Sequence, residues 1–157
     1  MQELADRKHP YRLPAEVYKT QRAPIFITIR AQRHTASIVP GLAPMVRQVL
    51  FERAERFGLL LHAYCIMPDH LHIVCSAKSC ESDFESFVTR LKSEVTRRAR
   101  GLGHARFAWE RSYWDRHARR EEDVPGMVQY VLDNPVRKEL CQRWEDWPWS
   151  EFVGWSS

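Results

Sequence analysis

Two strand-like runs, residues 59–67 and 70–76, are separated by only Pro68 and Asp69. Both runs are mainly apolar and contain leucine and isoleucine, with a tyrosine in the first and a valine in the second, side chains that suit a half-buried or buried strand. Proline followed by aspartate is a turn-forming pair, so the two runs predict an antiparallel β-hairpin. The remaining elements have to be arranged around this hairpin.

The segments that flank the hairpin alternate between strand and helix patterns. Residues 25–30 alternate bulky β-branched and aromatic side chains, which predicts a first strand. Residues 41–57 repeat apolar side chains with helical spacing, and Gly58 ends that pattern. After the hairpin, residues 82–100 begin with a Ser-Asp cap and acidic first turn and carry a second helical apolar stripe.

The last part of the chain is expected to add one more strand and one more helix. Residues 107–117 are aromatic-rich and predict a fourth strand, and a third helix follows that ends near Pro135. The order β-α-β-β-α-β-α describes a split-βαβ, ferredoxin-like α+β sandwich with a four-stranded antiparallel sheet. A length of 157 residues suits one domain over the whole chain, with a basic lead-in, residues 1–22, that can be mobile.

Composition narrows the classes of protein that this chain can belong to. The net charge of +4 is compatible with a polyanionic partner but does not require one. The four cysteines have no Cys-x-x-Cys spacing, and the N-terminus lacks the apolar core of a secretion signal. No apolar stretch approaches the roughly 20 residues of a membrane helix. We therefore expect reduced thiols, a cytoplasmic location and no membrane partner.

His70 and His72 lie two residues apart in the second run of the hairpin. Side chains alternate between the faces of a strand, so both imidazoles project from one face and can offer nitrogens to one point. Taken alone, the pair is better explained as two half-buried histidines that form hydrogen bonds on the sheet.

Tyr130 and Asn134 change that interpretation, because four residues along a helix place them on one face, one turn apart. An Asn134 amide oxygen together with His70 and His72 makes a three-ligand metal site that leaves positions for water or a phosphate oxygen. Tyr130 would lie beside those positions, which suits phosphoryl transfer by attack of its oxygen. Tyr130 alone would be explained by core packing.

At these residues the chain resembles the single-tyrosine HUH transposases, and most closely the REP-associated tyrosine transposases, or RAYT proteins. The His-x-His motif alone is a weak signal, but His-x-His followed at this distance by Tyr-x-x-x-Asn-Pro-Val-Arg is specific. The matching segments follow the family's order over most of the chain, at residues 64–74, 90–92, 109–115, 130–137 and 147–150.

The resemblance implies a function and a role for each matching residue. It implies that His70, His72 and Asn134 hold Mg²⁺ or Mn²⁺ and that Tyr130 is the nucleophile. The implied substrate is single-stranded DNA folded into REP-like hairpins, cut through a covalent 5′-phosphotyrosine and resealed without an external energy source. The resemblance is compatible with a monomer or a homodimer.

Two segments depart from the family's pattern. Family members commonly begin the first strand with a glycine and a Tyr-His pair, which residues 23–30 lack. Recognition of a guide sequence therefore need not follow the family. After Pro135 the usual small residues are replaced by Lys138 and Glu139, which lie outside the proposed site.

The second helix is rich in basic residues, of which four are predicted to bind DNA: Arg90, Lys92, Arg97 and Arg98. They could line a groove for the DNA backbone, or they could form a solvated helix face balanced by neighbouring glutamates. Several aromatic residues could stack on unpaired bases, although packing in a small core is the favoured interpretation for most of them: Trp109, Tyr113, Trp114, Trp144, Trp147 and Trp149.

Other functions stay open beside the leading hypothesis of a metal-dependent DNA transposase. A zinc site with Cys75 is disfavoured, because an odd offset places Cys75 on the strand face opposite the histidines. A second hypothesis is a protein that binds structured single-stranded nucleic acid on its sheet without cutting it. A purely structural or metal-storage protein would have no salt-dependent affinity for nucleic acid.

Overall fold

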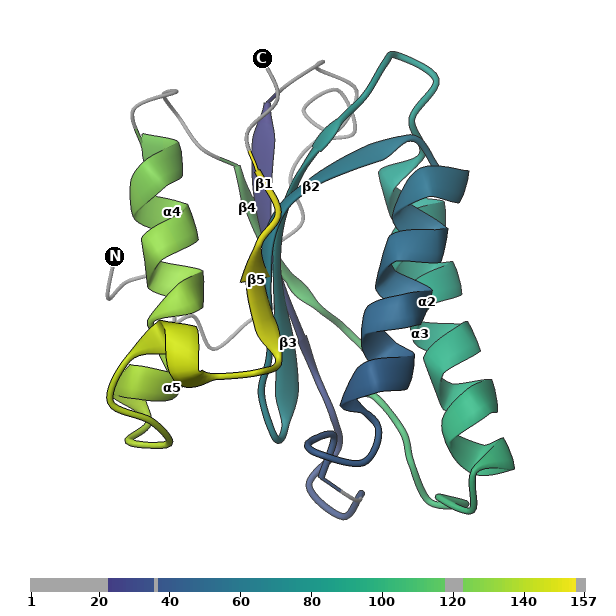
Figure 1. Ribbon diagram of the computed structural model, residues 1–157. Helices are drawn as coiled ribbons and strands as arrows, with labels where there is room; N and C mark the ends of the chain where they lie inside the picture. The colour runs from purple at the N-terminus through teal and green to yellow at the C-terminus, as the bar shows by residue number, and fades with distance from the viewer. Residues whose placement is uncertain (1–22, 36, 118–122, 155–157) are drawn as a thin grey trace.

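The computed structural model describes residues 23–35, 37–117 and 123–154, so the predicted lead-in, residues 1–22, lies outside the described part of the chain. The elements of the described part are shown in Figure 1. In chain order they are β1 (Pro24–Arg30), α2 (Ala43–Arg56), β2 (Leu59–Ile66), β3 (His70–Ala77), α3 (Phe84–Gly101), β4 (Trp114–His117), α4 (Asp123–Leu132), α5 (Asn134–Arg137), the 3₁₀ helix η2 (Trp144–Asp146) and β5 (Ser150–Phe152).

The strands form one sheet in the order β4-β1-β3-β2-β5, and all neighbouring pairs are antiparallel. The first four strands have the order expected of a ferredoxin-like α+β fold, which is therefore confirmed. The predicted count of four strands is wrong by one, because β5 pairs with the outer edge of β2. β5 has three residues, too few for the apolar alternation by which a strand is found in a sequence.

The predicted hairpin is formed by β2 and β3. The backbone N–H of Met67 donates to the carbonyl of His70 at 2.8 Å, which closes the turn at Pro68 and Asp69. β3 lies at the centre of the sheet, since residues 70–76 are also paired with β1. Both edges of the strand that carries His70 and His72 are thus held by backbone hydrogen bonds.

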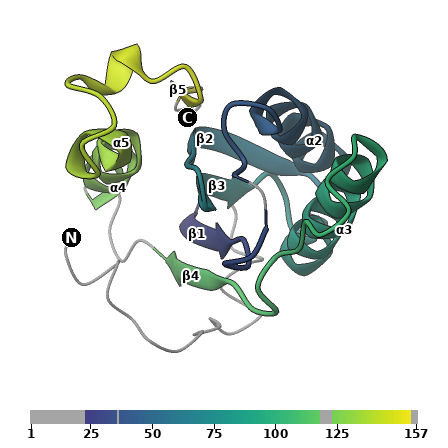
Figure 2. The ribbon, with the colours of Figure 1, turned by 90° about the horizontal axis from the view of Figure 1, so that it is seen from below.

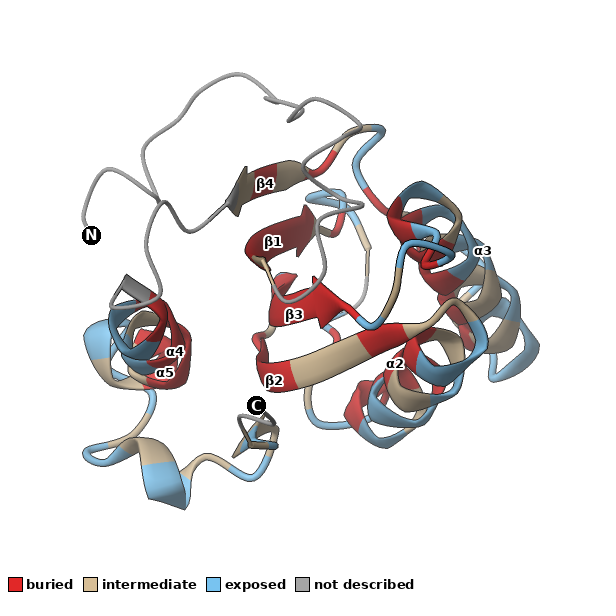
Figure 3. Cartoon of the chain, turned by 90° about the horizontal axis from the view of Figure 1, so that it is seen from above, coloured by how far each residue is buried: buried red, intermediate tan, exposed pale blue. Residues whose placement is uncertain are grey.

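Helices cover both faces of the sheet, as the view along it in Figure 2 shows: α2 and α3 lie on one face, and α4 and α5 lie on the other. Because successive side chains of a strand point to opposite faces, the core is divided into two parts, one on each face of the sheet. The first face carries Ile25, Ile27 and Ile29 of β1, whereas the second carries Phe26. Figure 3 shows buried residues concentrated in the central strands and on the inner sides of the helices.

Helix α3 begins one residue after its cap, which is Asp83 rather than Ser82. The Asp83 carboxylate accepts a hydrogen bond from the backbone N–H of Ser86 at 3.0 Å, as an N-cap should. Ser82 instead accepts hydrogen bonds from the backbone N–H groups of Lys78 and Ser79. The apolar stripe of the helix is buried, at Phe84, Phe87, Val88, Leu91, Val95 and Ala99.

The third helix, predicted to end near Pro135, ends two residues beyond it at Arg137 and is formed by two segments. It is interrupted at Asp133 and resumes as α5, which extends to Arg137. The backbone stays close to helical across the interruption, because Asp133 N–H donates to Gln129 O and Arg137 N–H donates to Asp133 O, both at 2.9 Å. Proline has no N–H to donate, which accounts for a break rather than an end.

Within the described residues, none of the helices has both the length and the apolar character required to span a bilayer.

Candidate active site

His70 and His72 project from β3 toward α4 and α5. Both side chains are buried, with 4% and 6% of their residue surface exposed. Their Nε2 atoms are 3.0 Å apart and their ring centroids 4.5 Å apart. The two imidazoles therefore direct their outer nitrogens toward a common point.

The remaining nitrogen of each histidine has a polar partner. His70 Nδ1 is 2.6 Å from Asp69 Oδ1, and His72 Nδ1 is 2.9 Å from Thr28 Oγ1. An ionised carboxylate only accepts, so Nδ1 of His70 carries the hydrogen and its Nε2 presents a lone pair. A carboxylate in this position fixes the orientation and tautomer of a metal-binding histidine.

Burial keeps both histidines in the neutral form that ligates metal. It lowers the pKa of His70, with Asp69 opposing the shift, and it lowers the pKa of His72 well below the ordinary value. The contact between Asp69 and His70 is thus a hydrogen bond from a neutral imidazole to a carboxylate. The hydrogen bond with His70 is also the main cause of a lowered Asp69 pKa.

Asn134 approaches the same point from the start of α5. Its side chain is buried, and its Nδ2 is 3.0 Å from His70 Nε2. Rotating a carboxamide by half a turn exchanges its nitrogen and oxygen, so Asn134 can present either a donor or a ligand oxygen here. The three predicted ligands are brought together from a central strand and the helix that faces it.

The spacing of these atoms fits a single divalent ion. Two ligands at right angles around an octahedral ion, each about 2.1 Å from it, are about 3.0 Å apart. The separations from His70 Nε2 to His72 Nε2 and to Asn134 are both 3.0 Å. Among the described residues, no three His, Cys, Asp or Glu side chains converge. A three-ligand site at this point therefore requires the Asn134 amide as its third ligand. Cys75 lies in the core on the other face of the sheet.

Tyr130 lies beside the histidines on α4. Its ring makes edge contacts with Phe26 and His72, at centroid distances of 6.1 and 6.5 Å. The guanidinium carbon of Arg137 lies over the ring, 3.8 Å from its centroid. The structure therefore places the predicted nucleophile next to the predicted ligands within one chain.

Several contacts of this site could not be found from the sequence. In the sequence, Asp69 is accounted for as a turn residue, so no role in the site is needed to explain it. Its position directly before His70 is nevertheless a signal that could have indicated a contact with that histidine. Thr28 reaches His72 because the two residues are opposite each other in the β1–β3 register, and no sequence pattern specifies that register. Arg137 belongs to the matching motif, but the motif gives it no role.

The four predicted DNA-binding residues lie on α3, on the other face of the sheet from the histidines (Figure 2). Arg97 and Arg98 are paired with Glu94 at 2.6 and 2.8 Å, and Arg98 also reaches Glu52 of α2 at 3.0 Å. Lys92 Nζ donates to the carbonyl oxygens of Glu110 and Arg111 at 2.8 and 3.2 Å. Much of this basic surface is thus internally paired.

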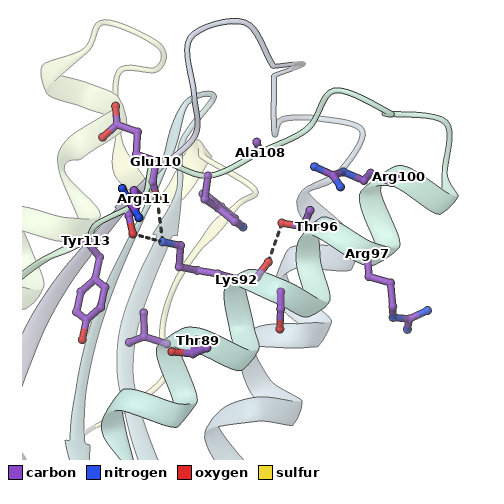
Figure 4. A pocket seen from close by; sticks show the side chains of 12 residues that line it. Thr89, Lys92, Thr96, Arg97, Arg100, Ala108, Glu110, Arg111 and Tyr113 are labelled. Atoms are coloured by element: carbon purple, nitrogen blue, oxygen red, sulfur yellow. Dashed lines mark hydrogen bonds between the residues drawn. The ribbon is translucent and has the colours of Figure 1, made fainter.

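A groove of about 800 Å³ separates α3 from the segment 108–113, as Figure 4 shows. Lys92, Arg97, Arg100 and Arg111 give it a positive lining, with Glu110 as its acidic member. Arg90 lines a different pocket, with Arg53 and Arg56, and Arg98 lines neither. The four predicted residues therefore do not form one surface.

The aromatic residues mainly complete the two cores. Trp109 and Tyr113 are each 7% exposed and belong to the core under α2 and α3. Trp144 and Trp147 pack against the core under α4, and Trp149 packs against the larger one. At these positions the packing interpretation agrees with the structure.

Comparison with known proteins relates this geometry to a family. The family model described as "Transposase IS200 like" matches residues 20–133. The REP-associated tyrosine transposase of Escherichia coli K12 is 24% identical over 127 residues, covering 81% of this chain and 74% of the relative. A Haemophilus influenzae relative that carries the same name is 25% identical over 137 residues, covering 81% and 78%.

A solved structure has a similar fold. A REP-associated tyrosine transposase bound to a REP hairpin superposes with a TM-score of 0.75, covering 95% of this chain and 92% of that one, at 19% identity.

Proposed function

Because this chain belongs to the IS200-like transposase family, we propose that it cuts and rejoins single-stranded DNA, with Tyr130 as the nucleophile. The observation that carries the proposal is the convergence of His70, His72 and Asn134 beside the Tyr130 ring. These residues meet within one chain, which supports action of Tyr130 on DNA held by its own subunit.

We propose hairpin-bearing single-stranded DNA as the substrate. The solved relative with the similar fold is bound to a REP hairpin. The net charge of +4 and the basic groove beside α3 suit a polyanionic ligand.

We further propose that His70, His72 and Asn134 hold Mg²⁺ or Mn²⁺. A bound divalent ion would supply polarisation of the scissile phosphate and neutralise part of its charge. Two neutral nitrogens and one amide oxygen, with no carboxylate ligand, leave the ion's charge available for the phosphate.

The reaction proposed for this chain's residues is a transesterification. Oη of Tyr130 loses its proton to water or a neighbouring base and attacks the phosphorus. A P–O bond to Tyr130 forms, the P–O bond to the 3′ oxygen breaks, and that oxygen takes up a proton. The product is a 5′-phosphotyrosine, and attack by a 3′ hydroxyl in the reverse sense reseals the strand without an external energy source.

The test is adduct formation with labelled hairpin DNA in the presence of Mg²⁺ or Mn²⁺. Wild type should give a protein–DNA adduct that survives denaturant, and Tyr130→Phe should give none. Tyr113→Phe makes the same chemical change at a buried core position and should retain the adduct. An undiminished adduct from Tyr130→Phe would exclude Tyr130 as the nucleophile, and hairpin binding without any adduct would favour the non-cleaving alternative.

A further inference from the structure

We infer that Arg137 binds the phosphodiester that Tyr130 attacks and holds the Tyr130 ring in place by stacking on it. This inference rests on the proposed function and assigns a further residue to the same site. Arg137 is exposed on α5 and contacts the Tyr130 ring, and no role was predicted for it from the sequence.

The contact geometry leaves Arg137 able to bind an anion. Its guanidinium carbon is 3.8 Å from the Tyr130 ring centroid, which is contact distance for stacking through the face of the group. The five N–H donors of a guanidinium point outward around the edge of its plane. None of the ion pairs formed among the described residues involves Arg137. The donors therefore lie next to the nucleophile and are not engaged by a carboxylate of that part of the chain.

The backbone fixes Arg137 in this position relative to Asn134. Arg137 N–H donates to Asp133 O at 2.9 Å, and Lys138 N–H donates to Asn134 O at 3.0 Å. The proposed ligand and the stacking arginine thus belong to the same short helical segment.

Charge around the site points to an anionic ligand. Arg137 is the last residue of α5 and Lys138 is its C-cap, three and four residues after Asn134. Arg30 is directly opposite His70 in the β1–β3 register. Asp69, the carboxylate hydrogen-bonded to a proposed ligand, contacts His70. A divalent ion bound by the histidines would add positive charge to this region, and a phosphodiester would offset part of that charge.

A packing role alone makes a different prediction. A cation–π contact at an exposed site is worth about 0.5–1 kcal/mol, and its loss would affect stability whatever the charge of the DNA. If Arg137 binds phosphate, the effect of removing its side chain on adduct formation must depend on the charge of one phosphate.

The experiment compares wild type, Arg137→Ala and Arg137→Lys on a hairpin oligonucleotide that wild type cuts, with either a phosphodiester or a neutral methylphosphonate at the cleavage position. On the phosphodiester, Arg137→Ala should slow adduct formation by about 30-fold, the size expected for a charge-assisted hydrogen bond. Arg137→Lys should recover part of the rate, because it keeps the charge but not the fork. On the methylphosphonate, wild type and Arg137→Ala should agree within about threefold.

Arg143→Ala is the matched control, since Arg143 is exposed and paired with Glu145 at 3.6 Å, and it should match wild type on both substrates. An equal deficit of Arg137→Ala on both substrates, or no deficit, would overturn the inference. Thermal unfolding of each variant identifies any variant that fails to fold.

A binding measurement separates this inference from the proposed function. If wild type binds hairpin DNA without forming an adduct, the proposed cleavage fails. Single methylphosphonates placed in turn along the flank of the hairpin then decide the role of Arg137. One position should weaken binding by wild type and leave binding by Arg137→Ala unchanged, and identical profiles for the two proteins would refute the phosphate contact.

Discussion

At the scale of single residues, Asp69 orients one of the proposed ligands. Its carboxylate accepts from Nδ1 of His70 at 2.6 Å, so it selects the tautomer whose Nε2 lone pair faces the site. Asp69→Ala should lower the affinity for Mn²⁺ by about tenfold or more, the usual cost of losing such a partner. Asp69→Asn should lose less Mn²⁺ affinity, because its amide oxygen can still accept the hydrogen bond from Nδ1 of His70.

Isothermal titration of the protein with Mn²⁺ measures this effect. Glu55→Ala, on the exposed side of α2, is the control for loss of one negative charge and should bind Mn²⁺ like wild type. Equal affinities for Asp69→Ala and wild type would mean that Asp69 has no part in positioning His70.

The residues of the candidate site differ in how far the sequence could specify them. His70 with His72, and Tyr130 with Asn134, are paired by spacings within a single element, and these spacings can be counted in the sequence. The contacts that join the two pairs depend on how α4 and α5 pack on the sheet. Phe26 illustrates the difference: it touches both His72 and Tyr130, yet in the sequence it is one more aromatic residue of a strand.

At the scale of elements, β5 is attached to the sheet through side chains as well as backbone. Arg47 donates to Glu151 at 2.9 Å and to the Tyr64 hydroxyl at 2.8 Å, and that hydroxyl donates to Glu151 at 3.1 Å. Burial raises the pKa of Tyr64 to about 12, so this hydroxyl keeps its proton. A strand held by such long-range contacts cannot be predicted from a local pattern, whereas α3 could be, from its cap and apolar stripe.

The end of β5 also depends on a buried histidine. His62 of β2 is within hydrogen-bonding distance of Ser76 Oγ at 2.7 Å and of the Gly154 carbonyl at 3.1 Å, and burial lowers its pKa. The unfolded histidine takes up a proton near pH 6.5, where the folded one still resists protonation. The free energy of unfolding should therefore fall as pH decreases from about 6.5 toward the lowered pKa, with no such loss above 6.5.

Urea unfolding at pH 7 and pH 5 tests this prediction. His62→Gln should lose less stability than wild type between the two pH values, because glutamine has no proton to gain. His34→Gln, at an exposed position, is the control and should follow wild type. A parallel loss in His62→Gln and wild type would show that His62 does not contribute to the acid sensitivity.

At the scale of the whole molecule, the candidate active site and the basic groove lie on opposite faces of one sheet. DNA that reaches both must pass around an edge of that sheet. Arg97 and Arg111 line the groove, so replacing both by glutamine should weaken hairpin binding. The slope of log affinity against log salt should also become shallower, by about 1 for each DNA phosphate that the double variant no longer binds.

Fluorescence anisotropy across a salt series measures that slope. Arg90→Gln is the matched control, since Arg90 lies on the same helix but lines a separate pocket, and its slope should equal that of wild type. An unchanged slope in the Arg97 and Arg111 double variant would exclude the groove as a path for the DNA backbone.

The central strand has a consequence for how this sequence can change over time. Along β3, His72 and Val74 face α4, whereas Leu71, Ile73 and Cys75 belong to the core under α2 and α3. Selection for chemistry and selection for folding therefore act on alternate positions of a single strand. The packing positions can exchange apolar residues of similar volume through many generations while the ligand positions stay unchanged. Relatives of low overall identity can then retain the same centre.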